Sequence, residues 1–193
     1  MARRQKGLNF YKKRRKINTE VVQEIWNWVF CIAVSILLAG VCVFAFGLKT
    51  SIIGVSMEPN LYNGQEVFIN RFIYQIKSPK SGDVVAFLPN GNQHTHSYVK
   101  RVVGVPGEHI QIREGKLYIN GIETDENYDK IADAGIAQHE ITLGVDEYFL
   151  LGDNVNSSED SRSGSIGSVK RENILGKAWF KTAAKNSALG FVE

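Results

Sequence analysis

The sequence predicts a mostly β protein, with a single N-terminal transmembrane helix followed by an all-β domain that is barrel-like or built on a folded sheet. Two observations support this fold class. Residues 28–48 form an apolar run without a charged residue, which is long enough to cross the hydrocarbon core of a bilayer. Residues 49–193 then carry at least seven short runs of β-branched and aromatic residues separated by turn residues, a pattern typical of all-β domains.

Charge is distributed unevenly along the chain. Eight of the 23 basic residues and none of the 20 acidic residues lie in residues 1–16, which leaves 15 basic and 20 acidic groups in the remainder. A basic arm can bind nucleic acid, but this arm directly precedes an apolar run, and basic flanks of a membrane helix stay in the cytoplasm. We therefore expect residues 1–27 to form a cytoplasmic arm with no nucleic-acid partner, and residues 49–193 to form an extracytoplasmic domain.

The apolar run of residues 28–48 predicts a membrane anchor rather than another kind of helix. A core helix of this length in a soluble protein has a polar face, and a cleaved secretory signal has a shorter apolar part. Trp26 and Trp28 lie at its start, where indole rings favour the headgroup level. The predicted localisation is a single-pass cell-membrane protein, with the lipid bilayer as a partner. Both cysteines lie inside the run, so we expect no disulfide, no metal site and no cofactor.

The strands expected after the anchor are short and bounded by Gly, Asn or Pro. They are predicted at residues 65–72, 83–87, 98–104, 109–113, 116–119, 148–151 and 175–182. The turn Glu114-Gly115 joins the fourth and fifth strands into a hairpin, and Asn120-Gly121 ends the fifth. Residues 125–144 are polar and mixed, which indicates a loop with at most one short helix.

A serine lies in a strand-to-turn transition a few residues after the anchor. Ser56 belongs to Gly-Val-Ser-Met-Glu-Pro-Asn, residues 54–60, and follows a β-branched run. Gly54 and Pro59 stop regular strand pairing, so the hydroxyl of Ser56 can face outward. Because serine is common in turns for ordinary hydrogen-bonding reasons, this stretch alone does not identify a nucleophile.

A lysine lies in the middle of the predicted strand 98–104. Side chains alternate along a strand, so Lys100 shares a face with Tyr98 and Val102. Lysines are usually solvated edge residues, but burial disfavours the ammonium form and lowers the pKa of the amine. A neutral amine can act as the general base for a serine hydroxyl.

A third stretch, residues 152–162, reads Gly-Asp-Asn-Val-Asn-Ser-Ser-Glu-Asp-Ser-Arg and follows an apolar strand. So many small polar residues indicate a loop held by its own hydrogen bonds. Alone, the stretch is an ordinary turn, or a weak match to a calcium-binding loop in which the spacing of the ligand residues is wrong.

Together the three stretches resemble the type I signal peptidases, membrane-bound serine proteases that remove signal peptides from exported proteins. The match also includes Asn63-Gly64, residues 81–85 and residues 100–108, and it covers most of residues 50–180 and the anchor. The short spacing between the motifs resembles the compact enzymes of Gram-positive bacteria. The resemblance implies a Ser–Lys protease domain that cleaves signal-peptide-bearing preproteins, with small residues at the first and third positions before the cut.

The resemblance also implies a role for individual residues. Ser56 matches the acyl nucleophile, whose backbone N–H contributes to the oxyanion hole, and Lys100 matches the general base. Among the supporting residues, Ser158 matches a serine that orients the lysine amine. Asp160 and Arg162 match a structural ion pair near the site, and Asp153 and Arg101 match residues that support its architecture.

Three positions depart from the family pattern. Gly54 stands where some relatives carry a serine whose hydroxyl is a second oxyanion donor, and Asn156 and Ser157 stand where many relatives have Asp and Asn. A glycine is sterically permissive, so we expect Gly54→Ser to be tolerated and to raise turnover several-fold.

Other readings stay open. Relatives of the endoplasmic-reticulum type use histidine as the base, and His94 and His96 precede Lys100. Two alternatives belong to other functional classes. One is a catalytically idle, membrane-tethered binding module or chaperone for exported proteins, and the other is a self-cleaving regulator. The sequence indicates no particular oligomeric state.

Overall fold

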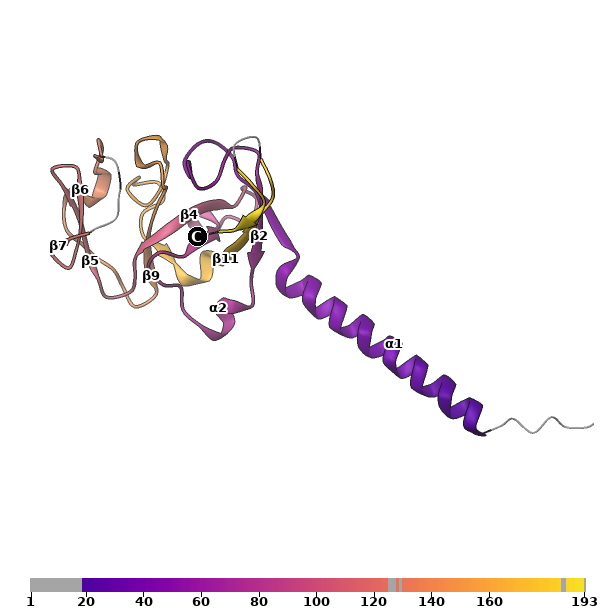
Figure 1. The fold of residues 1–193 in the computed structure, drawn as a ribbon. Helices are drawn as coiled ribbons and strands as arrows, with labels where there is room; N and C mark the ends of the chain where they lie inside the picture. The colour runs from indigo at the N-terminus through magenta and orange to yellow at the C-terminus, as the bar shows by residue number, and fades with distance from the viewer. Residues whose placement is uncertain (1–18, 125–127, 129, 185–186, 193) are drawn as a thin grey trace, which may run out of the picture. The chain divides into compact units, whose positions relative to one another are not determined.

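Figure 1 shows the fold in a computed structural model, which describes residues 19–124, 128, 130–184 and 187–192. The chain divides into two compact units, residues 1–41 and residues 42–193. Residues 1–18, which include most of the predicted cytoplasmic arm, lie outside the described residues.

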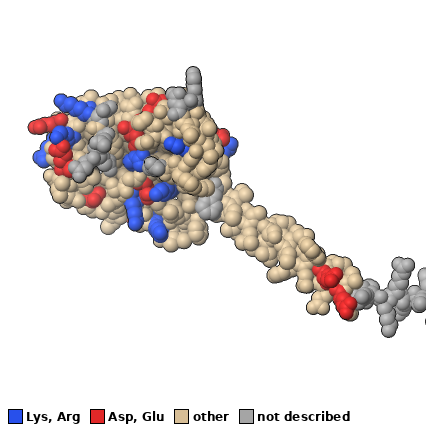
Figure 2. Space-filling view, viewed as in Figure 1, with Lys and Arg blue, Asp and Glu red and all other residues tan. Residues whose placement is uncertain are grey.

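A single long helix, α1 (Thr19–Phe46), contains most of the predicted apolar run. It is the one helix in the described part of the chain that is long and apolar enough to cross a membrane. Figure 2 shows charge on α1 only near its start, where Glu20 and Glu24 lie. The helix begins earlier than the apolar run because Thr19 and Glu20 suit a helix N-terminus. It ends two residues before the predicted boundary at Leu48, which already belongs to a strand.

The second unit, residues 42–193, is called the β unit below, and its described residues form two antiparallel sheets. The larger follows the order β1-β2-β11-β3-β4-β9-β10, and β12 also pairs with β11. Its strands are β1 (Leu48–Ser51), β2 (Glu66–Asn70), β3 (Val84–Phe87), β4 (Tyr98–Gly104), β9 (Glu147–Leu151), β10 (Val169–Lys170), β11 (Ile174–Lys181) and β12 (Gly190–Phe191). A short helix, α2 (Ile73–Ile76), follows β2.

The smaller sheet follows the order β7-β6-β5-β8. Its strands are β5 (His109–Arg113), β6 (Lys116–Ile119), β7 (Ile122–Glu123) and β8 (Ile141–Thr142). The described part of the unit also contains four short 3-10 helices: η1 (Pro89–Gly91), η2 (Gly135–Gln138), η3 (Val155–Ser157) and η4 (Arg171–Asn173).

The predicted mostly β fold is confirmed. Each of the seven predicted strands has a counterpart, with ends that differ by at most two residues. The sequence did not reveal β1, β7, β8, β10 and β12. Four of these have two residues, which is too short for an alternating pattern, and β1 begins inside the apolar run. The predicted loop of residues 125–144, apart from 125–127 and 129, which are not described, contains η2 and β8.

The centre of the larger sheet places the functional residues. β3 lies between β11 and β4 and is buried along its whole length. In the pairing of β3 with β4, Val85 lies opposite Lys100. β4 is paired on its other edge with β9, so its backbone is enclosed on both edges, and Lys100 in its middle is a buried residue.

Candidate active site

The turn that carries Ser56 is fixed by the core on both sides. Ile52 before it and Met57 and Leu61 after it are buried in one apolar cluster. The Leu61 N–H donates to the Met57 carbonyl at 2.8 Å, and the Asn154 N–H donates to the Ser56 carbonyl at 3.0 Å. Ser56 is therefore held between the core and the loop of residues 152–162, and 9% of the residue is exposed to solvent.

The amine of Lys100 reaches this serine. Lys100 Nζ lies 2.6 Å from Ser56 Oγ, and the residue is 4% exposed. Burial lowers the pKa of Lys100 to about 8, although the charges of Asp160, Glu159 and Asp153 oppose this shift. Since burial disfavours the ammonium form, a large fraction of the amine is neutral near pH 8. A neutral amine at this distance can accept the proton of the serine hydroxyl.

The neighbour of Lys100 on β4, Arg101, pairs with Asp153. Arg101 Nε lies 2.7 Å from Asp153 Oδ1, and Nη2 lies 2.8 Å from Oδ2. The same carboxylate accepts a hydrogen bond from Asn60 Nδ2 at 2.7 Å. This bidentate pair therefore connects β4, the loop of residues 152–162 and the end of the Ser56 turn.

A second bidentate pair lies within the loop itself. Arg162 Nε lies 2.8 Å from Asp160 Oδ1, and Nη2 lies 2.9 Å from Oδ2. Arg162 also donates to the carbonyls of Asp133 and Val155, and Asp160 Oδ2 accepts from the Gly152 N–H at 3.2 Å. Both charged residues are buried, so this pair stabilises the loop that contacts Ser56.

Ser158 lies close to the site without a hydrogen bond to Lys100. Its Oγ is buried and has no hydrogen-bond partner in the described part of the chain. A methyl group at Gly152 would lie 2.3 Å from Ser158 Oγ and 2.4 Å from the Ser56 carbonyl oxygen. The absence of a side chain at Gly152 thus allows both serines to approach this strand end. The orienting role of Ser158 stays a prediction.

Gly54 has a backbone reason to be glycine. Its φ is 84°, in the left-handed region that a side chain strains, and its N–H donates to Asn63 Oδ1 at 2.9 Å. Space around the missing Cβ is open, so backbone strain rather than crowding opposes substitution. The left-handed backbone therefore argues against the expectation that Gly54→Ser is tolerated, and that expectation stays a prediction.

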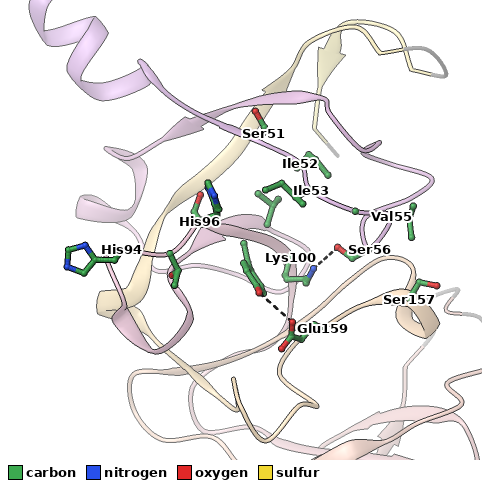
Figure 3. Close-up of a pocket in the computed structure, with 15 residues that line it drawn as sticks. Ser51, Ile52, Ile53, Val55, Ser56, His94, His96, Lys100, Ser157 and Glu159 are labelled. Atoms are coloured by element: carbon green, nitrogen blue, oxygen red, sulfur yellow. Dashed lines mark hydrogen bonds between the residues drawn. The ribbon is translucent and has the colours of Figure 1, made fainter.

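A groove of about 580 Å³ opens beside the two residues (Figure 3). Its lining includes the apolar side chains of Ile52, Ile53 and Val55, the hydrogen-bonded pair of Ser56 and Lys100, and the loop residues Ser157 and Glu159. His94 and His96 also line it, but in the described residues Lys100, not a histidine, hydrogen-bonds to Ser56 Oγ. No group of three or more His, Cys, Asp or Glu among the described residues could hold a metal ion.

The family model described as signal peptidase, peptidase S26, matches residues 25–183. The chain belongs to this family. It is 32% identical over 175 residues to signal peptidase I P of Bacillus subtilis subsp. natto, which covers 86% of this chain and 89% of the relative. It is 31% identical over 178 residues to signal peptidase IB of Staphylococcus aureus (strain COL), covering 82% and 90% of the two chains.

The chain is also similar to a solved structure of a signal peptidase I from Enterococcus faecalis, with 32% sequence identity. The match covers 53% of this chain and 97% of the solved chain, with a TM-score of 0.42. As a member of the signal peptidase family, the chain is a serine endopeptidase that removes signal peptides from preproteins. Signal peptidase I is membrane-associated, in keeping with the single apolar helix α1.

Two residues of this signal peptidase site lie in the stretches that resemble the family, residues 54–60 and 152–162, but the sequence predicted no individual role for them. Asn60 follows Pro59 in an ordinary turn, and Glu159 is one of several acids in a polar loop. Only the fold reveals that Asn60 reaches Asp153 across 93 residues of chain and that Glu159 lines the groove.

Proposed function

We propose that Ser56 and Lys100 are the catalytic dyad with which this signal peptidase cleaves its preproteins. The observation that carries the proposal is the 2.6 Å separation of Lys100 Nζ from Ser56 Oγ in a buried environment. Burial keeps the pKa of the amine near 8, so the base is available without a histidine. A positioned base of this kind typically contributes about 10²–10⁴-fold to the rate.

The reaction follows from this geometry. Neutral Lys100 accepts the proton of Ser56, and the oxygen attacks the carbonyl carbon of the last residue of the signal peptide. The Ser56 N–H stabilises the tetrahedral oxyanion. The ammonium of Lys100 then protonates the departing amine of the mature protein, which leaves an acyl-enzyme. Lys100 next accepts a proton from water, which attacks the ester carbonyl, and the Lys100 ammonium returns a proton to Ser56 Oγ as the signal peptide is released with a free carboxyl group.

The two ion pairs support this chemistry by holding the three parts of the site together. Arg101–Asp153 connects the strand of the base with the loop and, through Asn60, with the nucleophile turn. Asp160–Arg162 fixes the loop from within. We assign these residues positioning roles, because none of them touches Ser56 Oγ.

Cleavage of one signal-bearing precursor by the purified chain in detergent tests the proposal. Ser56→Ala should abolish cleavage at the signal boundary, and Ser51→Ala, which alters an exposed serine lining the same groove, should leave most of the rate. A precursor that binds but is not cleaved by the unmodified chain would instead favour an idle binding module. The match to a peptidase family does not favour that alternative.

We further propose that residues 49–193 lie on the extracytoplasmic side of the membrane, with α1 crossing the bilayer. The support is the charge distribution, since eight basic residues and no acidic residue precede the helix in residues 1–16. Protease added to intact cells without a wall should digest the β unit. If the β unit is protected and an N-terminal tag is digested, the orientation is the reverse.

A further inference from the structure

The groove beside the dyad has one charged wall. Figure 3 shows Glu159 and Ile53 on opposite sides of Lys100. Ile53 and Val55 are exposed apolar residues, 68% and 42% accessible, and they form an apolar side with Ile52. Of the described residues that line the groove, Glu159 is the one carboxylate.

The carboxylate of Glu159 is not committed to a cation. Its two hydrogen bonds come from Tyr98 Oη and Ser165 Oγ, both at 3.4 Å, which is long for a hydroxyl donor. No lysine, arginine or histidine in the described part of the chain forms an ion pair with it. The nearby acids differ in this respect, because Asp153 pairs with Arg101 and Asp160 with Arg162. Glu159 is therefore free to bind a cation of the substrate.

We infer that Glu159 is a specificity-determining residue that favours lysine or arginine at the second position before the cut. The inference rests on the proposed function. In an extended peptide, alternate side chains point to opposite sides. If the first and third residues before the cut face the apolar side, the second faces the wall that carries Glu159.

The size of the preference follows from the exposure of the pair. An exposed ion pair contributes up to about fivefold in an equilibrium or rate ratio, and replacing a lysine by a glutamate removes an attraction and adds a repulsion. The kcat/KM for a precursor with lysine should exceed that for the same precursor with glutamate by about tenfold. Salt should reduce the ratio, because the charges are exposed and are screened.

Three precursors that differ only at the second position before the cut, with Lys, Gln or Glu, test the inference. In Glu159→Gln the Lys-to-Glu ratio of kcat/KM should fall to near one, and in Glu159→Lys it should reverse. Glu58→Gln is the matched control: it removes the same charge from the nucleophile turn, but Glu58 does not line the groove. Its ratio should match the unmodified chain. Glu159 is exposed, so none of its variants should affect folding.

The ratio isolates substrate recognition from the chemistry. Burial lowers the pKa of Lys100 and the charge of Glu159 opposes this shift, so Glu159→Gln also changes the base. That change acts on every precursor alike and cancels in the ratio. Ser56→Ala in the same assay tests the dyad separately, because persistent cleavage there contradicts the proposed function whatever the ratio.

Three outcomes would overturn the inference. The first is an unmodified chain that cleaves the Lys and Glu precursors equally. The second is a ratio that Glu159→Gln leaves unchanged or that Glu58→Gln changes equally. The third needs a second set of precursors with Lys, Gln or Glu at the first position after the cut: if Glu159→Gln removes a charge preference only in that set, Glu159 contacts the mature protein instead.

Discussion

The side-chain amide of Asn60 donates a hydrogen bond to Asp153 Oδ2 at 2.7 Å. Asp153 is at the same time the partner of Arg101, the residue after Lys100. This one contact therefore connects the turn of the nucleophile to the strand of the proposed base. We expect the separation of Ser56 Oγ and Lys100 Nζ to depend on that connection.

Asn60→Leu should lower kcat by about threefold to tenfold and leave KM nearly unchanged, because it removes a bond to a charged acceptor without entering the groove. Steady-state kinetics on one precursor measures both constants. Asn156→Leu is the control, since Asn156 ties η3 to residues 130 and 132 and makes no contact with the nucleophile turn. An equal loss in both variants would mean that Asn60 acts only through general stability.

The pH dependence of cleavage should report the lysine. Burial lowers the pKa of Lys100 to about 8, and only the neutral amine can accept the proton. Below this pH, kcat/KM should rise about tenfold per pH unit, and above it the rate should level off. A rate that is already level between about pH 6 and 7 would contradict this account and favour a histidine base.

The stability of the fold should also depend on the protonation of Lys100, at higher pH than the cleavage rate. Lys100 has a folded pKa of about 8 against an ordinary value of 10.5. Between these values the unfolded chain holds a proton that the folded chain has released, so the free energy of unfolding rises with pH there, by a total on the order of 3 kcal/mol. Below pH 8 the whole cost of burying the ammonium is present.

Lys100→Met removes that cost while filling a similar volume. It should raise the free energy of unfolding at pH 7 by about 1–3 kcal/mol and remove the rise between pH 8 and 10.5. Denaturant unfolding in detergent at several pH values measures both effects. A variant that is less stable at pH 7 would show that the ammonium is well solvated in the folded chain.

Substitutions of Gly54 should follow its backbone rather than its side chain. Because φ is 84°, Gly54→Ala and Gly54→Ser should each lose about 1–2 kcal/mol of stability, and both should slow cleavage. Gly54→Asn should be tolerated best, since asparagine adopts the left-handed region more readily. If Gly54→Ser cleaves faster than both the unmodified chain and Gly54→Ala, the added hydroxyl completes the oxyanion hole despite the strain.

The sequence revealed local features better than contacts between distant segments. The strand of Lys100 could be predicted because its alternation is local, and β4 has the predicted bounds. The Ser56 turn could be predicted from Gly54 and Pro59. The Asn60–Asp153 bond could not, because it joins residues 93 positions apart that carry no shared pattern. The same holds for Glu159, whose freedom from cations depends on where Arg101 and Arg162 lie in the fold.

For the supporting residues, whose roles were implied by the family resemblance, the structure differs from the expected contacts in one detail. Asp160 and Arg162 form the expected ion pair, whereas Ser158 Oγ makes no hydrogen bond to Lys100 in the described part of the chain. Residue matching carries over the identity of a side chain but not its rotamer. Here Ser158 Oγ occupies the space that a side chain at Gly152 would need, because a Cβ added there would lie 2.3 Å from it.

The cleavage rate of Lys100→Met on a single precursor at about pH 8.5, beside that of His96→Ala, tests the dyad most directly. The unfolding experiment above shows whether the lysine variant is folded. With Lys100 as the base, Lys100→Met should show no cleavage above the blank, while His96→Ala should keep most of the rate. A folded Lys100→Met that cleaves at a near-normal rate, together with an inactive His96→Ala, would contradict the Ser56–Lys100 dyad.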